Sequence, residues 1–168
     1  LVKRSDLVVI LQVRSLPSSH VDKELSMTEE IPGPVGHTKH TDLSLDQIAE
    51  LQPGLGCIMP QVSERYWILY YAAKGGNWTL AARQRSELSG LLRLGAVTRP
   101  NYKDHLEAFL GGHVLALTRA IESEDWPAFE RVYQKGIDGS NAYHRDFDHA
   151  EIEWVLPLDP PKHLRLTP

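Results

Sequence analysis

The sequence predicts an all-α protein, an antiparallel up-and-down bundle of four helices, from two observations. Between residues 55 and 147 apolar residues recur at spacings of three and four, the period of a helix that is apolar on one face. Gly, Pro, Asn and Asp mark short breaks between these stretches. Four amphipathic helices of about 20 residues joined by short loops are typical of such a bundle.

Length and composition indicate one domain with flanking segments. The chain has 168 residues, 42% of them hydrophobic and 24% charged, which is enough to bury a core. We expect residues 1–42 to form an N-terminal strand and a covering loop, residues 43–149 the bundle, and residues 150–168 an extended tail that packs on it.

The two ends of the chain predict a small two-stranded β element. Residues 6–14 are compact and rich in β-branched side chains, and apolar and polar residues alternate over 150–158. An unpaired apolar strand would associate, so we expect these segments to pair, within the chain or across a dimer axis. Residues 17–41 are broken by Pro and Gly, which indicates a linker or covering loop.

The helices begin at recognisable caps. Ser44 and Gln47 form a capping box that opens a short extra helix, which Pro53 and Gly54 end. The first long helix runs to Gly75-Gly76, with Pro60 near its first turns. Its expected apolar stripe is Leu55, Met59, Val62, Tyr66, Leu69, Tyr70 and Ala73.

The other three helices follow the same logic. Asn77 caps the second helix, and Gly95 is its expected end. Pro100-Asn101 starts the third, and Asp125 caps the fourth. The expected apolar faces are Leu80, Ala81, Leu88, Leu91 and Leu92 on the second; Leu106, Phe109, Leu110, His113, Val114, Leu117, Ala120 and Ile121 on the third; and Phe129, Val132, Tyr133, Gly136, Ile137, Ser140, Tyr143, His144 and Phe147 on the fourth.

Charge and hydropathy exclude some classes of partner. The net charge is −4 and the basic residues form no stripe, which argues against nucleic acid. No stretch approaches the ~18 to 20 apolar residues of a membrane span. The apolar run of residues 7–11 is shorter than the apolar core of a signal peptide, which has about 7 to 15 residues. We therefore interpret it as a strand or as the start of a mature chain. The sequence does not decide the cellular compartment. Cys57 is the single cysteine, which excludes an intramolecular disulfide.

The end of the fourth helix resembles a known motif. Residues 139–144 read Gly-Ser-Asn-Ala-Tyr-His, followed by Asp148-His149 and a Pro-rich tail. This resembles the C-terminal helix of small bacterial c-type cytochromes of the four-helix-bundle, cytochrome c′-like kind, which reads Cys-Asn-Ala-Cys-His. Residues 53–59 and 72–82 resemble the first and second helices of that group, and the similarity covers roughly residues 43–158.

The resemblance implies a haem site that has lost its covalent anchors. In the family two cysteines form thioethers to haem and the histidine binds the iron. Here Ser140 and Tyr143 stand at the cysteine positions, and a thioether needs a thiol, so covalent haem is excluded while His144 remains. The resemblance implies that His144 would bind a non-covalent haem and that Met59 would shield the opposite side. Tyr66 stands where relatives often have histidine.

The same residues have ordinary structural interpretations. His144 would be a core histidine bonded to a carbonyl or carboxylate, Tyr143 would fill the space of a macrocycle edge, and Met59 would be core packing. The resemblance also implies a homodimer and an exported protein. For a haem or ligand site the candidates are therefore His144, Met59, Tyr66, Ser140 and Tyr143, with no resident metal site expected.

Further polar residues would face a cavity between the helices. They are Tyr102, His105, His113, Arg83, Glu87, Asp146, Asp148 and His149. An emptied cavity with such groups would suit acid–base chemistry by His144 with Tyr143, or by His113 with an acid. However, the sequence has no duplicated Glu-x-x-His pair, nucleophile elbow, phosphate-binding Gly loop or zinc pattern. His37 and His40 have a metal-like spacing but lie in a loop without cysteine or carboxylate support, where histidines are usually solvated.

Three functions follow. The first is a binding module that holds a small apolar ligand or non-covalent haem inside the bundle. The second is an enzyme, an isomerase, hydratase or hydrolase, that acts on a hydrophobic small molecule in the same cavity. The third is an interaction bundle that dimerises through its first long helices and terminal strands.

Overall fold

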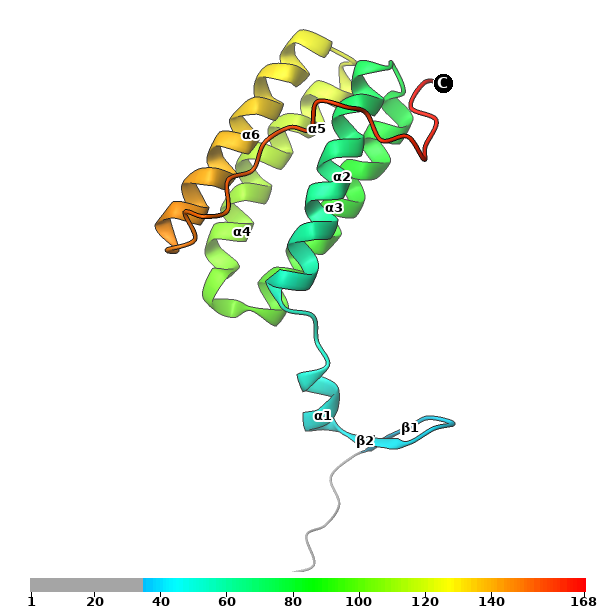
Figure 1. The fold of residues 1–168 in the computed structure, drawn as a ribbon, viewed down its shortest axis with the longest axis vertical. Helices are drawn as coiled ribbons and strands as arrows, with labels where there is room; N and C mark the ends of the chain where they lie inside the picture. Colours follow the sequence, from blue (N-terminus) through cyan, green and yellow to red (C-terminus); the bar gives the residue numbers. More distant parts are fainter. Residues whose placement is uncertain (1–34) are drawn as a thin grey trace, which may run out of the picture.

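The computed structural model describes residues 35–168, and this part of the chain is mostly helical (Figure 1). It begins with an antiparallel hairpin of β1 (Val35–His37) and β2 (Asp42–Ser44), in which Gly36 pairs with Leu43. The helical elements follow in the order α1 (Leu45–Glu50), α2 (Leu55–Lys74), α3 (Trp78–Thr98), the 3₁₀ turn η1 (Pro100–Tyr102), α4 (Lys103–Phe109), the π-helical turn η2 (Leu110–Val114), α5 (Leu115–Glu122) and α6 (Trp126–Asp146).

The predicted helix starts are confirmed. Ser44 and Gln47 form the capping box of α1, with both reciprocal hydrogen bonds present. The Asn77 side chain accepts a hydrogen bond from the Leu80 amide at 3.0 Å, and Asp125 accepts one from the Ala128 amide at 2.9 Å. Each cap satisfies an amide that the first helical turn leaves without a partner.

The prediction that Gly95 ends the second long helix is wrong. Helix α3 continues to Thr98, and Gly95 is buried inside it. A Cβ at this position would lie 3.0 Å from Leu55 Cδ2 and 3.3 Å from Leu106 Cδ1. The missing side chain therefore lets the neighbouring helices approach closely. In the sequence alone, a glycine with this packing role looks the same as a glycine that ends a helix.

The predicted third helix is continuous in path but changes its pitch at η2. The buried residues Phe109 and Val114 are five positions apart across this wider turn, and Leu117 and Ile121 then continue at spacings of three and four. The π turn thus absorbs one extra residue and keeps the buried side chains on one side. Leu110 and His113, expected on that face, are only partly buried.

The β element lies elsewhere than expected. Residues 6–14 fall outside the described residues, and residues 150–158 belong to no strand, since Ala150 and Glu151 lie in a turn and the rest is irregular. The sheet is the β1–β2 hairpin, inside a segment expected to be mainly a covering loop. The hairpin and α1 lie beyond the start of α2, away from the long helices, and α1 has no buried residue (Figure 1).

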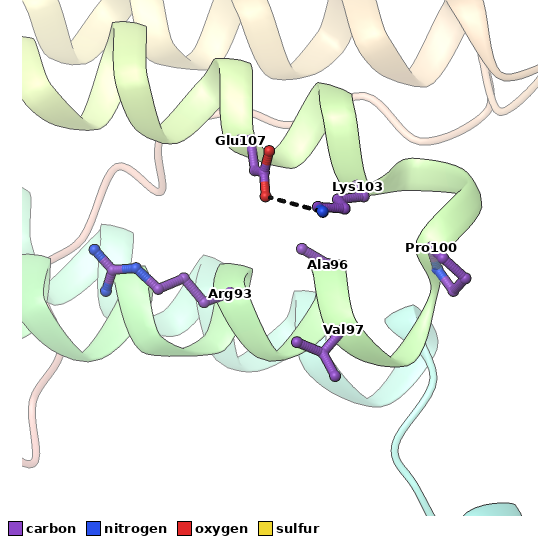
Figure 2. A pocket seen from close by; sticks show the side chains of 6 residues that line it. All are labelled: Arg93, Ala96, Val97, Pro100, Lys103 and Glu107. Carbon is purple, nitrogen blue, oxygen red and sulfur yellow. Dashed lines mark ion pairs between the residues drawn. The ribbon is translucent and has the colours of Figure 1, made fainter.

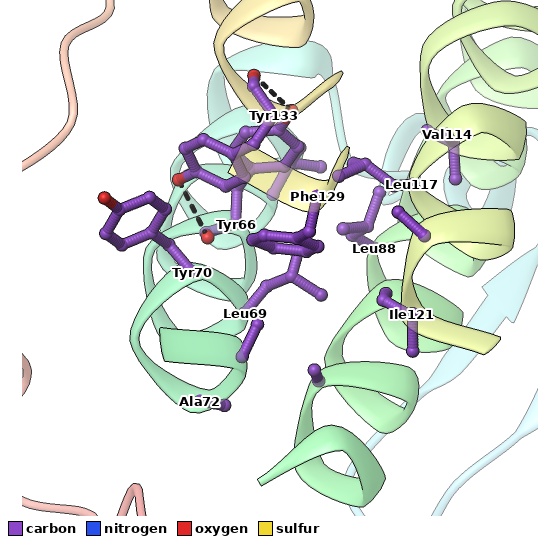
Figure 3. Close-up of a cluster of buried hydrophobic side chains, with 14 of the residues drawn as sticks. Tyr66, Leu69, Tyr70, Ala72, Leu88, Val114, Leu117, Ile121, Phe129 and Tyr133 are labelled. Atoms are coloured by element: carbon purple, nitrogen blue, oxygen red, sulfur yellow. Dashed lines mark hydrogen bonds between the residues drawn. The ribbon is translucent and has the colours of Figure 1, made fainter. Parts of the chain in front are cut away.

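The core joins α2, α3, α5 and α6 through aromatic and aliphatic side chains (Figure 3). At its centre Tyr66 and Tyr133 stack with ring centroids 4.2 Å apart, and each hydroxyl donates to the other residue's backbone carbonyl at 3.0 Å. Gly136 makes this possible, because a Cβ there would overlap the Tyr66 hydroxyl. Burial raises the pKa of both tyrosines, so both stay neutral.

The C-terminal tail runs back along the helices after α6 ends (Figure 1). The chain reverses at Asp148, whose φ of 58° is left-handed. Two aromatic side chains of α2 then bind tail carbonyls: Trp67 Nε1 donates to Asp159 at 3.0 Å, and the Tyr71 hydroxyl lies 2.7 Å from the Pro157 oxygen and 2.6 Å from that of Leu158. The tail is thus fastened through its backbone.

Candidate ligand cavity

A cavity of about 810 Å³ lies between α2, the η1–α4 segment, the end of α6 and the tail. Its volume is within the roughly 300–1,000 Å³ of typical small-molecule sites. The apolar part of the wall consists of Leu55, Met59, Pro60, Val62, Leu92, Leu106, Phe109, Phe147, Ile152 and Trp154. The predicted stripe of α2 is therefore divided, since Leu69 and Tyr70 are buried in the core whereas Leu55 and Met59 face the cavity.

The last turns of α6 provide the wall that the sequence singled out. The residues of this wall are Ser140, Tyr143 and His144. Ser140 lies one helical turn before the adjacent pair Tyr143 and His144. His144 Nδ1 lies 2.9 Å from the Ile152 carbonyl oxygen. A carbonyl only accepts hydrogen bonds, so Nδ1 carries a proton, and in the neutral imidazole Nε2, across the ring, keeps its lone pair. The hydrogen bond thus favours the neutral tautomer whose Nε2 is free to bind a ligand or metal ion.

An aromatic group surrounds Tyr143 at the η1–α4 side. Its ring lies edge-on to His105 with centroids 5.6 Å apart, and 6.4 Å from Phe109. The Phe147 ring packs against the rings of Tyr102 and His105, with centroids 4.9 Å and 4.6 Å apart. Tyr143 therefore packs into the wall, and the cavity exists with this tyrosine in place.

The tail closes one side of the cavity through a pair of hydrogen bonds that the sequence did not suggest. The Asn141 side chain accepts from the Trp154 amide at 2.7 Å and donates to the Trp154 carbonyl at 2.9 Å, as a neighbouring β-strand would. The indole Nε1 of Trp154 donates to Ser63 Oγ at 3.0 Å, and its ring lies 4.7 Å from Tyr66. Asn141 and Ser63 have no sequence signal, because their partner is 13 and 91 residues away.

All five predicted cofactor-site residues, Met59, Tyr66, Ser140, Tyr143 and His144, line this cavity, as do Tyr102, His105 and His149. The Tyr66 hydroxyl, however, is engaged by the Tyr133 carbonyl. His113 is not on the wall: its ring packs 4.9 Å from Phe109 and against Gly139, where a Cβ would overlap it.

The other expected polar residues lie outside the cavity. Arg83 and Arg65 each pair with Glu87 at 3.0 Å on the surface of α2 and α3. Asp146 and Asp148 are exposed and do not line the wall.

The loop histidines form no metal site within residues 35–168. His37 Nδ1 lies 2.8 Å from Asp42 Oδ1 across the hairpin, with both side chains mostly exposed. In this part of the chain no three His, Cys, Asp or Glu side chains are grouped to hold a metal ion.

A smaller depression of about 440 Å³ lies between α3 and α4, and Figure 2 shows the side chains that line it. Arg93, Ala96, Val97 and Pro100 line it together with the surface ion pair of Lys103 and Glu107, 3.9 Å apart. It contains no residue that the sequence predicted for a site. Its wall is largely exposed.

Comparisons with known proteins return no match: no family model, curated protein or solved structure is similar to the chain. Among the helices of residues 35–168, none has the length and apolar content needed to cross a membrane. The functional interpretation therefore rests on the chemistry and shape of the cavity.

Proposed function

We propose that this protein is a binding module that holds a small apolar ligand, or haem without covalent attachment, in the cavity between α2 and α6. The observation that carries the proposal is a largely apolar cavity of about 810 Å³ at the place where Met59 and His144 were expected to face a ligand. The same proposal takes the long helices as an antiparallel up-and-down bundle of the cytochrome c′-like kind. The short connections between α2, α3 and the later helices support it.

The residues present fit a non-covalent haem. His144 would offer Nε2 to the iron, and its Nδ1–H bond to the Ile152 carbonyl would fix the ring. Met59 on α2 and Phe109 on α4 would pack against the macrocycle. Bound haem would supply an iron centre for electron transfer or gas binding. Ser140 and Tyr143 have no thiol, so this protein would hold haem by ligation and packing alone.

Binding is a better match to the cavity than acid–base catalysis. Of the two catalytic pairs predicted from the sequence, the one with His113 lies outside the cavity wall. His144 and Tyr143 both line the cavity, yet His144 is engaged by a backbone carbonyl and Tyr143 packs against His105. Neither residue has a carboxylate partner within residues 35–168 that would hold it as an acid or base.

A spectroscopic titration tests the proposal. We expect hemin to give a Soret band that saturates with one site per chain, and the uncharged apolar dye Nile red to become fluorescent in the same cavity. His144→Ala should weaken hemin binding and leave Nile red binding intact, whereas His40→Ala, on the exposed hairpin, should change neither. Met59→Trp should reduce binding of both, because it fills the cavity. If neither hemin nor Nile red binds the folded protein, the proposal is wrong.

A further inference from the structure

Among residues 35–168, Arg99 is the one lysine or arginine that lines the cavity, and its surroundings indicate the chemical class of the ligand. Arg99 follows the last residue of α3 and is partly buried. A Cβ at Gly54 would lie 2.8 Å from Arg99 Nη2, so the guanidinium packs against the residue that immediately precedes α2. Arg99 is therefore at the end of the cavity where α2 starts.

The charge of Arg99 is not balanced by a neighbour within residues 35–168. No carboxylate of that range lies within ion-pairing distance, whereas Arg65 and Arg83 both bind Glu87. Within residues 35–168 its one side-chain hydrogen bond runs from Nη1 to the Thr98 carbonyl at 2.6 Å, which leaves most of the five guanidinium donors without a partner in that range. A guanidinium stays charged at any ordinary pH, and a bound anion would pair with the donors that remain. None of the Arg99 nitrogens is a fully buried polar atom without a partner, so these donors are open to such an anion.

The cavity is elongated away from this cation. Its wall follows α2 from Leu55 to Tyr66, a distance of about 16 Å at 1.5 Å per residue. Met59, Val62 and Phe109 line the stretch between, and Trp154 lies against Tyr66 at the far end. The carboxylate on the wall, Glu153, is exposed on the tail and forms no ion pair with Arg99.

We infer that the ligand is an apolar body that ends in a carboxylate, and that Arg99 binds the carboxylate. The shared chemistry is that of a medium-chain alkyl carboxylate or a propionate-bearing porphyrin, with the apolar part directed along α2 toward Tyr66. A guanidinium binds a carboxylate through two parallel hydrogen bonds, which gives both affinity and orientation. The inference rests on the proposed binding function and adds the charge and polarity of the ligand.

The test compares acids with matched uncharged molecules. Dodecanoate is measured against dodecan-1-ol, and hemin against its dimethyl ester, by calorimetric titration of the full chain. In the wild-type protein we expect the acid to bind about tenfold to a hundredfold more tightly than its uncharged partner. Arg99→Gln should abolish that preference, and Arg99→Lys should retain part of it. Arg93→Gln, an exposed arginine on α3 outside the cavity, should leave it unchanged.

The outcomes separate this inference from the proposed function. A preference for the acid in either pair that disappears in Arg99→Gln supports the inference, and the pair that shows it identifies the apolar body. Equal binding of acid and uncharged partner in the wild type overturns the inference while the binding function stands. Loss of all binding in every protein overturns both. Circular dichroism checks that each variant is folded, and the wild-type comparison of ligands stands without any variant.

Discussion

Asn141→Asp tests whether one side chain holds the tail against the cavity. Asn141 donates from Nδ2 to the Trp154 carbonyl and accepts from its amide. Aspartate has the same shape and keeps the acceptor, but its second oxygen would face the carbonyl oxygen at about the 2.9 Å of the lost bond. An unpaired, partly buried carbonyl costs about 1–3 kcal/mol, and the stronger remaining charged bond offsets part of that cost. We expect the free energy of unfolding to fall by about 1–2 kcal/mol.

Urea unfolding followed by circular dichroism measures this change, and the indole Nε1–H resonance of Trp154 reports the local effect. Asn101→Asp is the matched control, because Asn101 is exposed and forms no side-chain hydrogen bond to another described residue. Asn141→Ala, which removes both bonds, should be destabilised at least as much. The reasoning is refuted if Asn141→Asp and Asn101→Asp unfold at the same urea concentration with the Trp154 resonance unmoved.

Three further changes have definite expected results. Gly136→Ala should destabilise by about 1–3 kcal/mol, because its Cβ would overlap the Tyr66 hydroxyl, whereas Gly90→Ala, with open space around it, should stabilise by up to about 1 kcal/mol; thermal unfolding compares the two. Asp125→Ala should cost about 1 kcal/mol through loss of the α6 cap, and Asp125→Asn should cost much less; equal losses in urea unfolding would contradict the capping role. Burial, with help from the hydrogen bond to Glu130, raises the pKa of Tyr70 from 10.0 to about 12. The unfolded chain therefore ionises first as the pH rises, so stability should fall between about pH 10 and 12 and fall less in Tyr70→Phe, as alkaline urea titrations would show.

Sequence reasoning succeeded where the deciding interactions are local. Helix caps satisfy amides three residues away, so Ser44, Asn77 and Asp125 were readable from the chain alone. The periodicity of α6 likewise predicted that Tyr143 and His144 share a face, and both line the cavity.

Features that depend on contacts between residues distant in the sequence could not be predicted. His105 and His113 are eight positions apart and would share a helix face, but the π turn η2 changes the register between them, so only His105 reaches the cavity. Gly95 was predicted to end a helix, yet its lack of a side chain makes room for Leu55 and Leu106. Arg99 carried no motif, and its position against Gly54 depends on how α2 and α3 pack.

The way the tail is fastened decides which substitutions it tolerates. Trp67 and Tyr71 bind the backbone oxygens of residues 157–159, and every amino acid supplies such an oxygen. Point substitutions there should be well accepted, as the exposure of these residues also suggests. An insertion or deletion between Asn141 and Asp159 would instead move every acceptor out of reach at once. In homologous chains the length of this segment should therefore be conserved more strictly than its residue types.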